Sequence, residues 1–184
     1  MPETIADLVI RDALLIDGSG NPGVRGDLAV KDDRIVAIGD LAKLKSAREI
    51  KANGLALAPG FVDTHTHDDR ALLADPLMAC KVSQGVTTVI TGNCGISLAP
   101  LSIDRYPPPP LDIIAREPSQ FFASFQGYLS ALDRDPPALN AACQVGHTTL
   151  RAGVMVTRLS SKLKRLLTWR TDAPTSTGHG DPKR

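Results

Sequence analysis

The sequence predicts an α/β fold in which a small antiparallel β unit is followed by strand–helix–strand units. Three observations lead to this class: short strand-like runs joined by turns before residue 58, a strand–helix–strand pattern after it, and a further apolar strand near residues 141–145. A strand, a helix and a second strand in succession form a βαβ unit, for which parallel pairing is expected.

The first 57 residues are expected to form short strands joined by tight turns. A hairpin is predicted where two apolar runs flank Lys31-Asp32-Asp33. The expected strands span residues 8–10, 14–16, 27–30, 34–38, 49–51 and 55–57. Five or six short strands with little helix bury little area, so we expect this unit to need a partner layer.

The βαβ pattern begins after Ala58-Pro59-Gly60. Phe61 to His67 is predicted as a strand that ends in polar residues. Residues 75–84 fit a short helix, with Pro76 in the first turn and Gly85 as the C-terminal cap. Val86 to Ile90 is continuous and β-branched, which is typical of a strand buried on both faces.

Two further elements follow a long connection that contains Pro107 to Pro110. We expect these prolines to lie in an extended surface loop. Residues 121–132 are predicted as a helix, since Phe125, Tyr128, Leu129 and Leu132 follow a helical spacing. A third strand is predicted over residues 141–145, and a helix is expected to begin near Leu150.

Composition excludes several classes of protein. The chain has 184 residues, 21 basic and 20 acidic side chains, 42% hydrophobic residues and 4% aromatic residues. No apolar run approaches the roughly 20 residues of a membrane helix, and no basic stripe with aromatics indicates nucleic-acid binding. Three irregularly spaced cysteines form no disulfide framework, and no secretory signal is visible, so we expect a cytoplasmic protein.

The charge changes sign near residue 157. Residues 1–156 carry 14 basic and 18 acidic side chains, net −4, whereas residues 157–184 carry 7 and 2, net +5. The last 17 residues are rich in Thr, Pro, Ser, Gly and charges. We expect residues 157–184 to form a divergent, basic and disordered tail.

The main chemical signal is His65-Thr66-His67. Histidines at positions i and i+2 of a strand point to the same face. At the end of a strand they can converge on one metal ion, and imidazole suits zinc. Asp63 lies on the same face, where it could orient a metal-ligating residue through a hydrogen bond. Asp68 adds a carboxylate directly after His67.

The second signal is Cys94, in Gly92-Asn93-Cys94-Gly95 after the second strand. Because functional sites of parallel α/β sheets assemble at the C-terminal ends of strands, Cys94 is expected beside the two histidines as a soft zinc ligand. His147 ends the third strand and could face the same region, although a hydrogen-bonded loop histidine is the favoured interpretation. Cys80 and Cys143 fit better as buried, small apolar residues.

These residues resemble the D-aminoacylase (N-acyl-D-amino-acid deacylase) branch of the amidohydrolase superfamily. The resemblance covers about residues 5–156 and is carried by residues 58–69, 81–89, 92–100 and 145–151. It implies an incomplete (β/α)8 metal-dependent hydrolase barrel preceded by the N-terminal share of a small β-sandwich. The implied domains are residues 1–57, 58–156 and the tail 157–184.

The resemblance also implies a chemistry. Zinc bound by His65, His67 and Cys94 would activate water to hydrolyse the amide of a small N-acyl amino acid, giving a carboxylate and a D-amino acid. Asp63, Asp68, Asn93 and His147 are the expected site-adjacent residues. The family's further histidine ligands and general-base aspartate come later than residue 184, so we expect a truncated chain, inactive alone, with a frameshift as one explanation of the tail.

Three alternatives stay open at this point. One is a hydantoinase- or dihydroorotase-like cyclic amidohydrolase, against which Cys94 argues because those enzymes use a carboxylated lysine as bridging ligand. Another is a non-catalytic metal-binding remnant that needs a complementing partner chain. The last is a pseudogene product that folds poorly and has no function.

Overall fold

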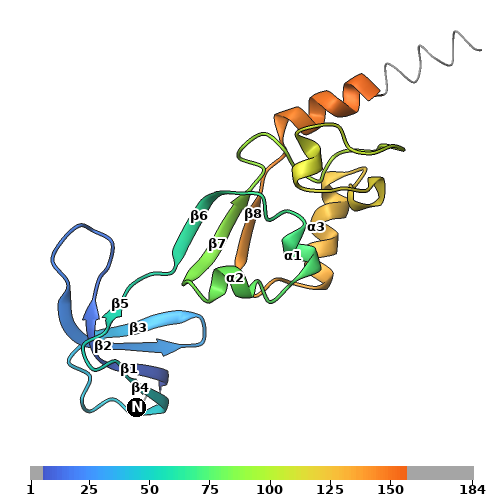
Figure 1. The fold of residues 1–184 in the computed structure, drawn as a ribbon. Helices are drawn as coiled ribbons and strands as arrows, with labels where there is room; N and C mark the ends of the chain where they lie inside the picture. The colour runs from blue at the N-terminus through green and yellow to red at the C-terminus, as the bar shows by residue number, and fades with distance from the viewer. Residues whose placement is uncertain (1–5, 157–184) are drawn as a thin grey trace, which may run out of the picture. The chain divides into compact units, whose positions relative to one another are not determined.

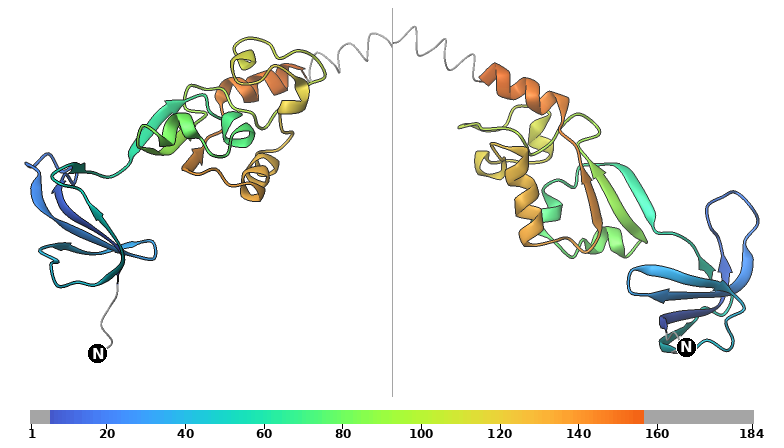
Figure 2. Two further views of the ribbon diagram at one scale, coloured as in Figure 1. Left: turned by 60° about the horizontal axis from the view of Figure 1, so that its bottom comes forward. Right: turned by 180° about the vertical axis from the view of Figure 1, so that it is seen from behind.

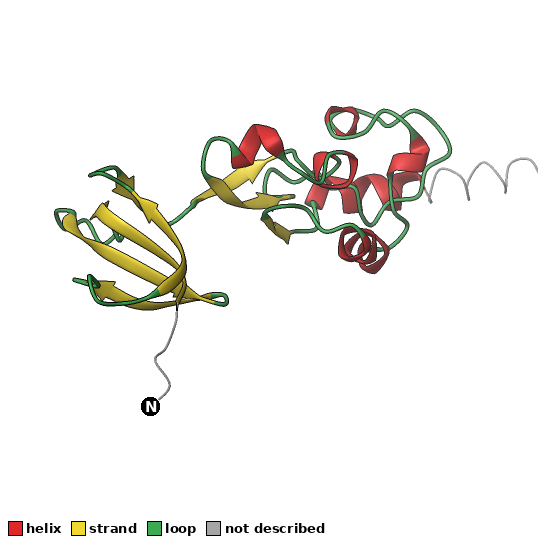
Figure 3. Cartoon of the chain, turned by 90° about the horizontal axis from the view of Figure 1, so that it is seen from below, coloured by secondary structure: helices red, strands yellow, loops and turns green. Residues whose placement is uncertain are grey.

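The computed structural model of the protein describes residues 6–156, which form two units that divide between Gly60 and Phe61 (Figure 1). The first unit contains strands and loops, whereas the helices belong to the second unit (Figure 3). The predicted tail 157–184 lies outside the described residues. Within residues 6–156, no helix is long and apolar enough to cross a membrane.

The first unit is a five-stranded mixed sheet with the order β3-β2-β1-β4, in which β5 also pairs with β1. Its strands are β1 (Ala6–Leu15), β2 (Val24–Lys31), β3 (Arg34–Gly39), β4 (Ser46–Lys51) and β5 (Ala56–Leu57). The hairpin around Lys31-Asp32-Asp33 is confirmed, because β2 and β3 pair antiparallel. The expectation of a wholly antiparallel unit is wrong, since β4 and β5 both run parallel to β1.

Strand β1 joins two runs that were expected to be separate strands. Its pairing with β2 is irregular between Ile10 and Ala13, where Asp12 has a φ of 53°. The irregularity lets one long strand carry both apolar runs. Ala6, Val9 and Ala29 form the small core of this unit.

The second unit is built on a three-stranded parallel sheet with the order β6-β7-β8. The strands are β6 (Phe61–Thr66), β7 (Val86–Thr91) and β8 (Asn140–Cys143). The α/β class and the parallel pairing are therefore confirmed. The third strand begins at residue 140 instead of 141 and ends at residue 143 instead of 145.

The connection between β6 and β7 differs from the predicted helix over 75–84. It contains two single-turn helices, α1 (Ala71–Ala74) and α2 (Ala79–Val82). Met78 adopts a left-handed backbone with φ 46°, and its side chain is fully buried. The turn at Met78 thus breaks the helix and delivers an apolar side chain to the core. The C-cap of α2 is Ser83 and not Gly85 as predicted; Gly85 (φ +81°) lies two residues later, at the end of the turn that leads into β7.

Helix α3 (Phe125–Arg134) begins four residues later than predicted. Ser124 caps it, because its Oγ accepts a hydrogen bond from the Gly127 N–H at 3.1 Å. The predicted apolar stripe is present, with Tyr128 and Leu132 buried. Two 3₁₀ helices, η1 (Leu111–Ile113) and η2 (Pro118–Gln120), precede α3.

The core of the second unit lies among β7, the loops after it and helices α1 and α3 (Figure 2). Leu72 of α1 and Val89 of β7 are fully buried there. Tyr128 of α3 donates a hydrogen bond from its hydroxyl to the Asp69 carbonyl oxygen at 2.9 Å. After β8 the chain turns into a helix over residues 147–156. This core fixes the strand ends that carry the predicted site.

Candidate metal centre

The C-terminal ends of β6 and β7 carry the three strongest candidate ligands. His65 is the penultimate residue of β6, and His67 follows the strand directly. Cys94 lies three residues after β7, beyond a turn in which Gly92 has a φ of +80°. A side chain at Gly92 would overlap the Gln144 carbonyl, so only glycine lets the backbone turn Cys94 toward β6 at this point.

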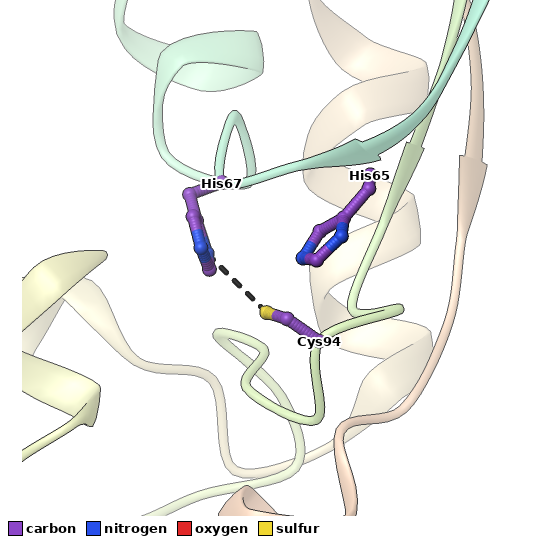
Figure 4. Close-up of side chains that lie close together, drawn as sticks. All are labelled: His65, His67 and Cys94. Carbon is purple, nitrogen blue, oxygen red and sulfur yellow. Dashed lines mark hydrogen bonds between the residues drawn. The ribbon is translucent and has the colours of Figure 1, made fainter.

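The structure brings His65, His67 and Cys94 together. One ligand atom from each lies within 4.8 Å of the others, and all three side chains are exposed. Figure 4 shows the two imidazoles and the thiol directed toward a common point. The Cys94 Sγ lies 3.4 Å from the His67 Nδ1, and the two imidazole centroids are 6.0 Å apart at an interplanar angle of 64°.

This geometry fits a metal ion of the zinc type. Tetrahedral zinc holds nitrogen at about 2.1 Å and sulfur at about 2.3 Å, which places the two ligand atoms about 3.6 Å apart. The observed distance of 3.4 Å between Sγ and Nδ1 is close to this expected separation of the two ligand atoms. Two imidazoles and one thiol are a donor set that suits zinc and is unsuited to magnesium or calcium.

Asp63 and Asp68 lie beside the centre without joining it. Lys81 of α2 places its Nζ 2.6 Å from the Asp63 Oδ2 and 3.0 Å from the Asp68 Oδ2. The hydrogen bond from Lys81 holds the pKa of Asp63 below its usual value. The other oxygen of Asp63 accepts a hydrogen bond from the His65 backbone N–H at 3.3 Å, so Asp63 contacts the backbone of a ligand.

Asn93 joins the two ligand-bearing segments. Its Nδ2 donates a hydrogen bond to the Thr64 carbonyl oxygen at 2.8 Å. The contact links the residue before Cys94 to the residue before His65. It therefore fixes the spacing between the cysteine loop and the histidine strand, which matches the expectation that Asn93 adjoins the site.

His147 and the two other cysteines are placed differently from the sequence interpretation, and His179 lies outside the described residues. His147 begins the helix over residues 147–156 and lies outside the ligand cluster, so it is not a loop residue. Cys80 is exposed on α2, a one-turn helix none of whose residues is buried, so the expectation of a buried thiol is wrong there. Cys143 packs partly against the core, but it ends β8 rather than lying in mid-strand.

A buried polar group lies just beyond the histidines. The Asp69 side chain is 1% exposed, and burial raises its pKa to about 6. Burial likewise raises the pKa of Cys143 and of Tyr128, which both lie near Asp69. These groups attach the loop after His67 to the core.

Lys81 is the site-adjacent residue that the sequence analysis missed. It is half-buried, and it also donates a hydrogen bond to the Thr66 Oγ1 at 3.2 Å. The hydrogen bonds to Asp63 and Asp68 raise its pKa against the opposing effect of burial. Helical spacing alone could not show that this lysine faces β6, because α2 is too short to have a periodic pattern.

Comparison with known proteins identifies relatives of this arrangement. A protein-family model described as "Amidohydrolase family" matches residues 48–164 of this chain. A D-aminoacylase from Alcaligenes xylosoxydans xylosoxydans is 55% identical over 149 residues, covering 81% of this chain and 31% of the relative. An N-acyl-D-aspartate deacylase from the same organism is 57% identical over 150 residues, covering 82% and 30%.

Solved structures agree with the sequence relatives. A crystal structure of D-aminoacylase has a TM-score of 0.78 and 52% identity, covering 82% of this chain and 31% of that one. The N-acyl-D-glutamate deacylase from Bordetella bronchiseptica, complexed with zinc and a phosphonate inhibitor, has a TM-score of 0.75 and 40% identity, with the same coverage. The present chain thus spans about a third of the length of these relatives.

Proposed function

The chain belongs to the amidohydrolase family and to its D-aminoacylase branch, and we propose that His65, His67 and Cys94 bind a divalent metal ion used in amide hydrolysis. The observation that carries the proposal is the convergence of three ligand atoms at the ends of two adjacent parallel strands. Zinc is the ion we propose, because imidazole and thiolate together favour it.

Around the three ligands, other residues of this chain hold the ligand-bearing segments in position through hydrogen bonds and ion pairs. When bound, zinc supplies Lewis acidity toward a carbonyl oxygen and makes water a stronger acid. His65, His67 and Cys94 would hold the ion and would leave room on it for water or for a further protein ligand. Asn93 holds the cysteine loop against β6, and the ion pairs of Lys81 hold the segment that carries both histidines.

The substrate class we propose is an N-acyl-D-amino acid, hydrolysed to a carboxylate and a D-amino acid. The names of the relatives support this class: a D-aminoacylase and deacylases of N-acyl-D-aspartate and N-acyl-D-glutamate. The phosphonate inhibitor in one of the structural relatives is described as a mimic of the tetrahedral intermediate, which also fits hydrolysis of an acyl compound.

We further propose that the 184-residue chain does not turn over this substrate alone. Among residues 6–156, no carboxylate joins the three ligands, so none is in place there to act as the general base. Strands β6 and β8 each have one edge unpaired within the described residues, and Phe61 and Val62 are largely exposed. These open edges support a (β/α)8 barrel completed by further strands, supplied by a complementing polypeptide, with the first unit as a share of a β-sandwich.

Metal binding by the purified chain tests the proposal. Zinc affinity is measured by competition with a chelating dye, and cobalt is used as a spectroscopic probe of thiolate ligation. We expect Cys94→Ser to abolish the thiolate-to-cobalt absorption. We also expect it to weaken zinc binding by at least about tenfold, the loss seen even for outer hydrogen-bond partners of a metal site. Cys80→Ser is the matched control, since Cys80 is also an exposed cysteine but does not belong to the ligand cluster.

Equal zinc affinity in Cys94→Ser and Cys80→Ser would overturn the metal centre. Hydrolysis of N-acetyl-D-amino acids is then assayed with the chain alone and after co-expression with the segment of a relative that this chain does not cover. We expect release of the D-amino acid only in the second case. Turnover by the chain alone would contradict the proposed need for a complementing polypeptide.

A further inference from the structure

A cavity of about 510 Å³ lies in the second unit, separate from the three candidate metal ligands. Its walls are the loop that contains the four consecutive prolines and the helix over residues 147–156. A volume of this size is typical of sites for small organic molecules, which usually occupy roughly 300–1,000 Å³. Nothing in the proposed metal chemistry uses this cavity.

One face of the helix supplies one wall. His147, Arg151 and Met155 line the cavity at a spacing of four residues, and Thr148 and Ala152 line it beside them. Residues four apart lie above one another on a helix. The same helix face therefore presents polar side chains, including the Arg151 guanidinium, before the apolar residues at its end.

The charge of the lining is positive. The guanidinium groups of Arg105 and Arg151 line the cavity, and no acidic side chain is among the described residues that do so. Arg105 has an ion pair with Asp104 at 3.4 Å, but both side chains are strongly exposed, so this pair holds the guanidinium only weakly. Arg151 makes no ion pair with any described residue.

Most of the remaining lining residues are apolar. Ile103 and Tyr106 come from the proline-containing loop, and Ala152 and Val156 come from the helix. Leu101 supports this arrangement from beneath, because it is 2% exposed and its side chain lies 3.7 Å from the position of a Cβ at Gly153. A ligand in the cavity thus meets guanidinium groups at one part and aliphatic carbon at another.

The cavity adjoins the cysteine loop of the candidate metal centre. Thr148, which lines the cavity, donates a hydrogen bond from its backbone N–H to the Gly95 carbonyl oxygen at 2.8 Å. Gly95 directly follows Cys94. Gly146 also packs so closely on Gly95 that an added Cβ would lie 2.5 Å from the Gly95 carbonyl oxygen.

We propose that this cavity binds a small carboxylate that carries an apolar chain, with Arg151 and Arg105 contacting the carboxylate and the aliphatic wall covering the chain. Guanidinium groups bind carboxylates through paired, charge-assisted hydrogen bonds. Two sources share this chemistry: the amino-acid end of an N-acyl amino acid, and the acyl carboxylate released from it. The binding itself does not depend on a metal ion, and only the identity of the two sources rests on the proposed function.

Calorimetric titration of the metal-free 184-residue chain tests the proposal. The probes are hexanoate for a released acyl group, N-acetyl-D-leucine for the amino-acid end, and hexanamide as the neutral counterpart of hexanoate. We expect saturable binding of at least one carboxylate and none of hexanamide. Arg151→Gln should weaken that binding about tenfold, as expected for loss of a charge-assisted hydrogen bond.

Arg116→Gln is the matched control, because Arg116 is exposed and does not line the cavity. We expect it to bind like the parent chain. Ala152→Phe fills the cavity and should abolish binding, while circular dichroism checks that each variant is folded. A stronger response to hexanoate assigns the cavity to the acyl product, and a stronger response to N-acetyl-D-leucine assigns it to the amino-acid end.

The double variant His65→Ala/His67→Ala separates this proposal from the metal centre, since carboxylate binding should persist in it. No saturable binding of either carboxylate, equal binding of hexanamide and hexanoate, or equal loss in Arg151→Gln and Arg116→Gln would each overturn the proposal. Failure of the chain to bind zinc would overturn only the proposed metal centre.

Discussion

The Nζ atom of Lys81 lies 2.6 Å from the Oδ2 atom of Asp63, and this ion pair connects helix α2 to the strand that carries His65. The same ammonium group lies 3.0 Å from Asp68, on the other side of the two histidines in the sequence. A single lysine therefore holds both ends of the segment between Asp63 and Asp68. All three side chains are largely shielded from solvent, with exposed fractions of 20%, 29% and 17%.

The first prediction concerns Lys81→Met, which keeps the length of the side chain and removes its charge. Without the ammonium group, Asp63 and Asp68 repel each other and the segment with His65 and His67 loses its fixed position. We expect zinc affinity to fall about tenfold, in the range seen when outer partners of metal ligands are removed. Competition with a chelating dye measures the change.

Two further variants control this experiment. Lys81→Arg retains the charge and should recover part of the affinity, which a purely steric role would not explain. Lys51→Met alters an exposed lysine of β4 in the first unit and should bind zinc like the parent chain. If Lys81→Met binds zinc as tightly as Lys51→Met does, Lys81 does not position the ligands.

The second prediction concerns Thr149, which is fully buried and pairs with the backbone of Ser97. Its Oγ1 accepts a hydrogen bond from the Ser97 N–H at 2.8 Å and donates one to the Ser97 carbonyl oxygen at 3.0 Å. Thr149→Val leaves both backbone groups buried and unpaired. We expect the free energy of unfolding to fall by about 2 kcal/mol.

Urea denaturation followed by circular dichroism measures this loss. Thr87→Val is the matched control, because Thr87 is an exposed residue of β7 at which valine also suits a strand. The control should change the stability by less than about 0.5 kcal/mol. Similar losses in both variants would mean that the contact between Thr149 and Ser97 does not stabilise the fold.

The sequence predicted those parts of the fold that depend on local patterns. The β-branched run at Val86 and the helical spacing of Tyr128 and Leu132 each identified an element correctly. The parallel pairing of β4 with β1 was missed, because β2 and β3 separate these strands in the sequence and no local pattern reports the pairing of distant strands. The break at Met78 was also missed, since burial of its side chain, a tertiary effect, overrides the helical pattern.

The candidate site was likewise predicted where it depends on local sequence patterns and missed where it depends on tertiary packing. Strand ends and the spacing of His65, His67 and Cys94 were sufficient to predict that these three residues meet. The role of Lys81 depends on how a one-turn helix packs on β6, which no pattern of four residues encodes. The cavity beside His147 was equally inaccessible, because it forms between two segments about 40 residues apart in the sequence.

The third prediction separates two effects of glycine substitution. Gly92 and Gly85 have nearly equal φ angles, +80° and +81°. A methyl group at Gly85 would only touch the Phe61 ring at 3.5 Å, whereas at Gly92 it would overlap the Gln144 carbonyl. Gly85→Ala should therefore cost about 1–2 kcal/mol from the left-handed backbone alone, and Gly92→Ala should cost more.

The measurement combines stability with metal binding. Urea denaturation gives the free energy of unfolding for both variants, and dye competition gives the zinc affinity. We expect only Gly92→Ala to weaken zinc binding, because the turn at Gly92 directs Cys94 toward the histidines. Equal stability losses and unchanged zinc affinity in both variants would contradict a specific role of the Gly92 turn.

The last prediction concerns the acid stability of the first unit. Asp27 of β2 accepts hydrogen bonds from the Asp12 N–H at 2.9 Å, from Arg11 at 3.2 Å and from the Leu41 N–H at 3.3 Å. These hydrogen bonds, of which the one from the Asp12 N–H has the largest effect, hold the pKa of Asp27 below its usual value despite partial burial. The folded state therefore binds a proton less readily at Asp27 than the unfolded state does.

A lowered carboxylate pKa stabilises the fold above the pKa of the unfolded state, about 3.9, and the contribution is lost as the pH falls through the folded-state value. Asp27→Asn removes this contribution at every pH. We expect the parent chain to be more stable than the variant at pH 6, and the difference to shrink from about pH 5 downward. Urea denaturation at pH 6 and at pH 3 measures it, with the exposed Arg34→Gln as the control. A difference between parent and Asp27→Asn that is the same at both pH values would show that the Asp27 carboxylate does not carry the acid sensitivity.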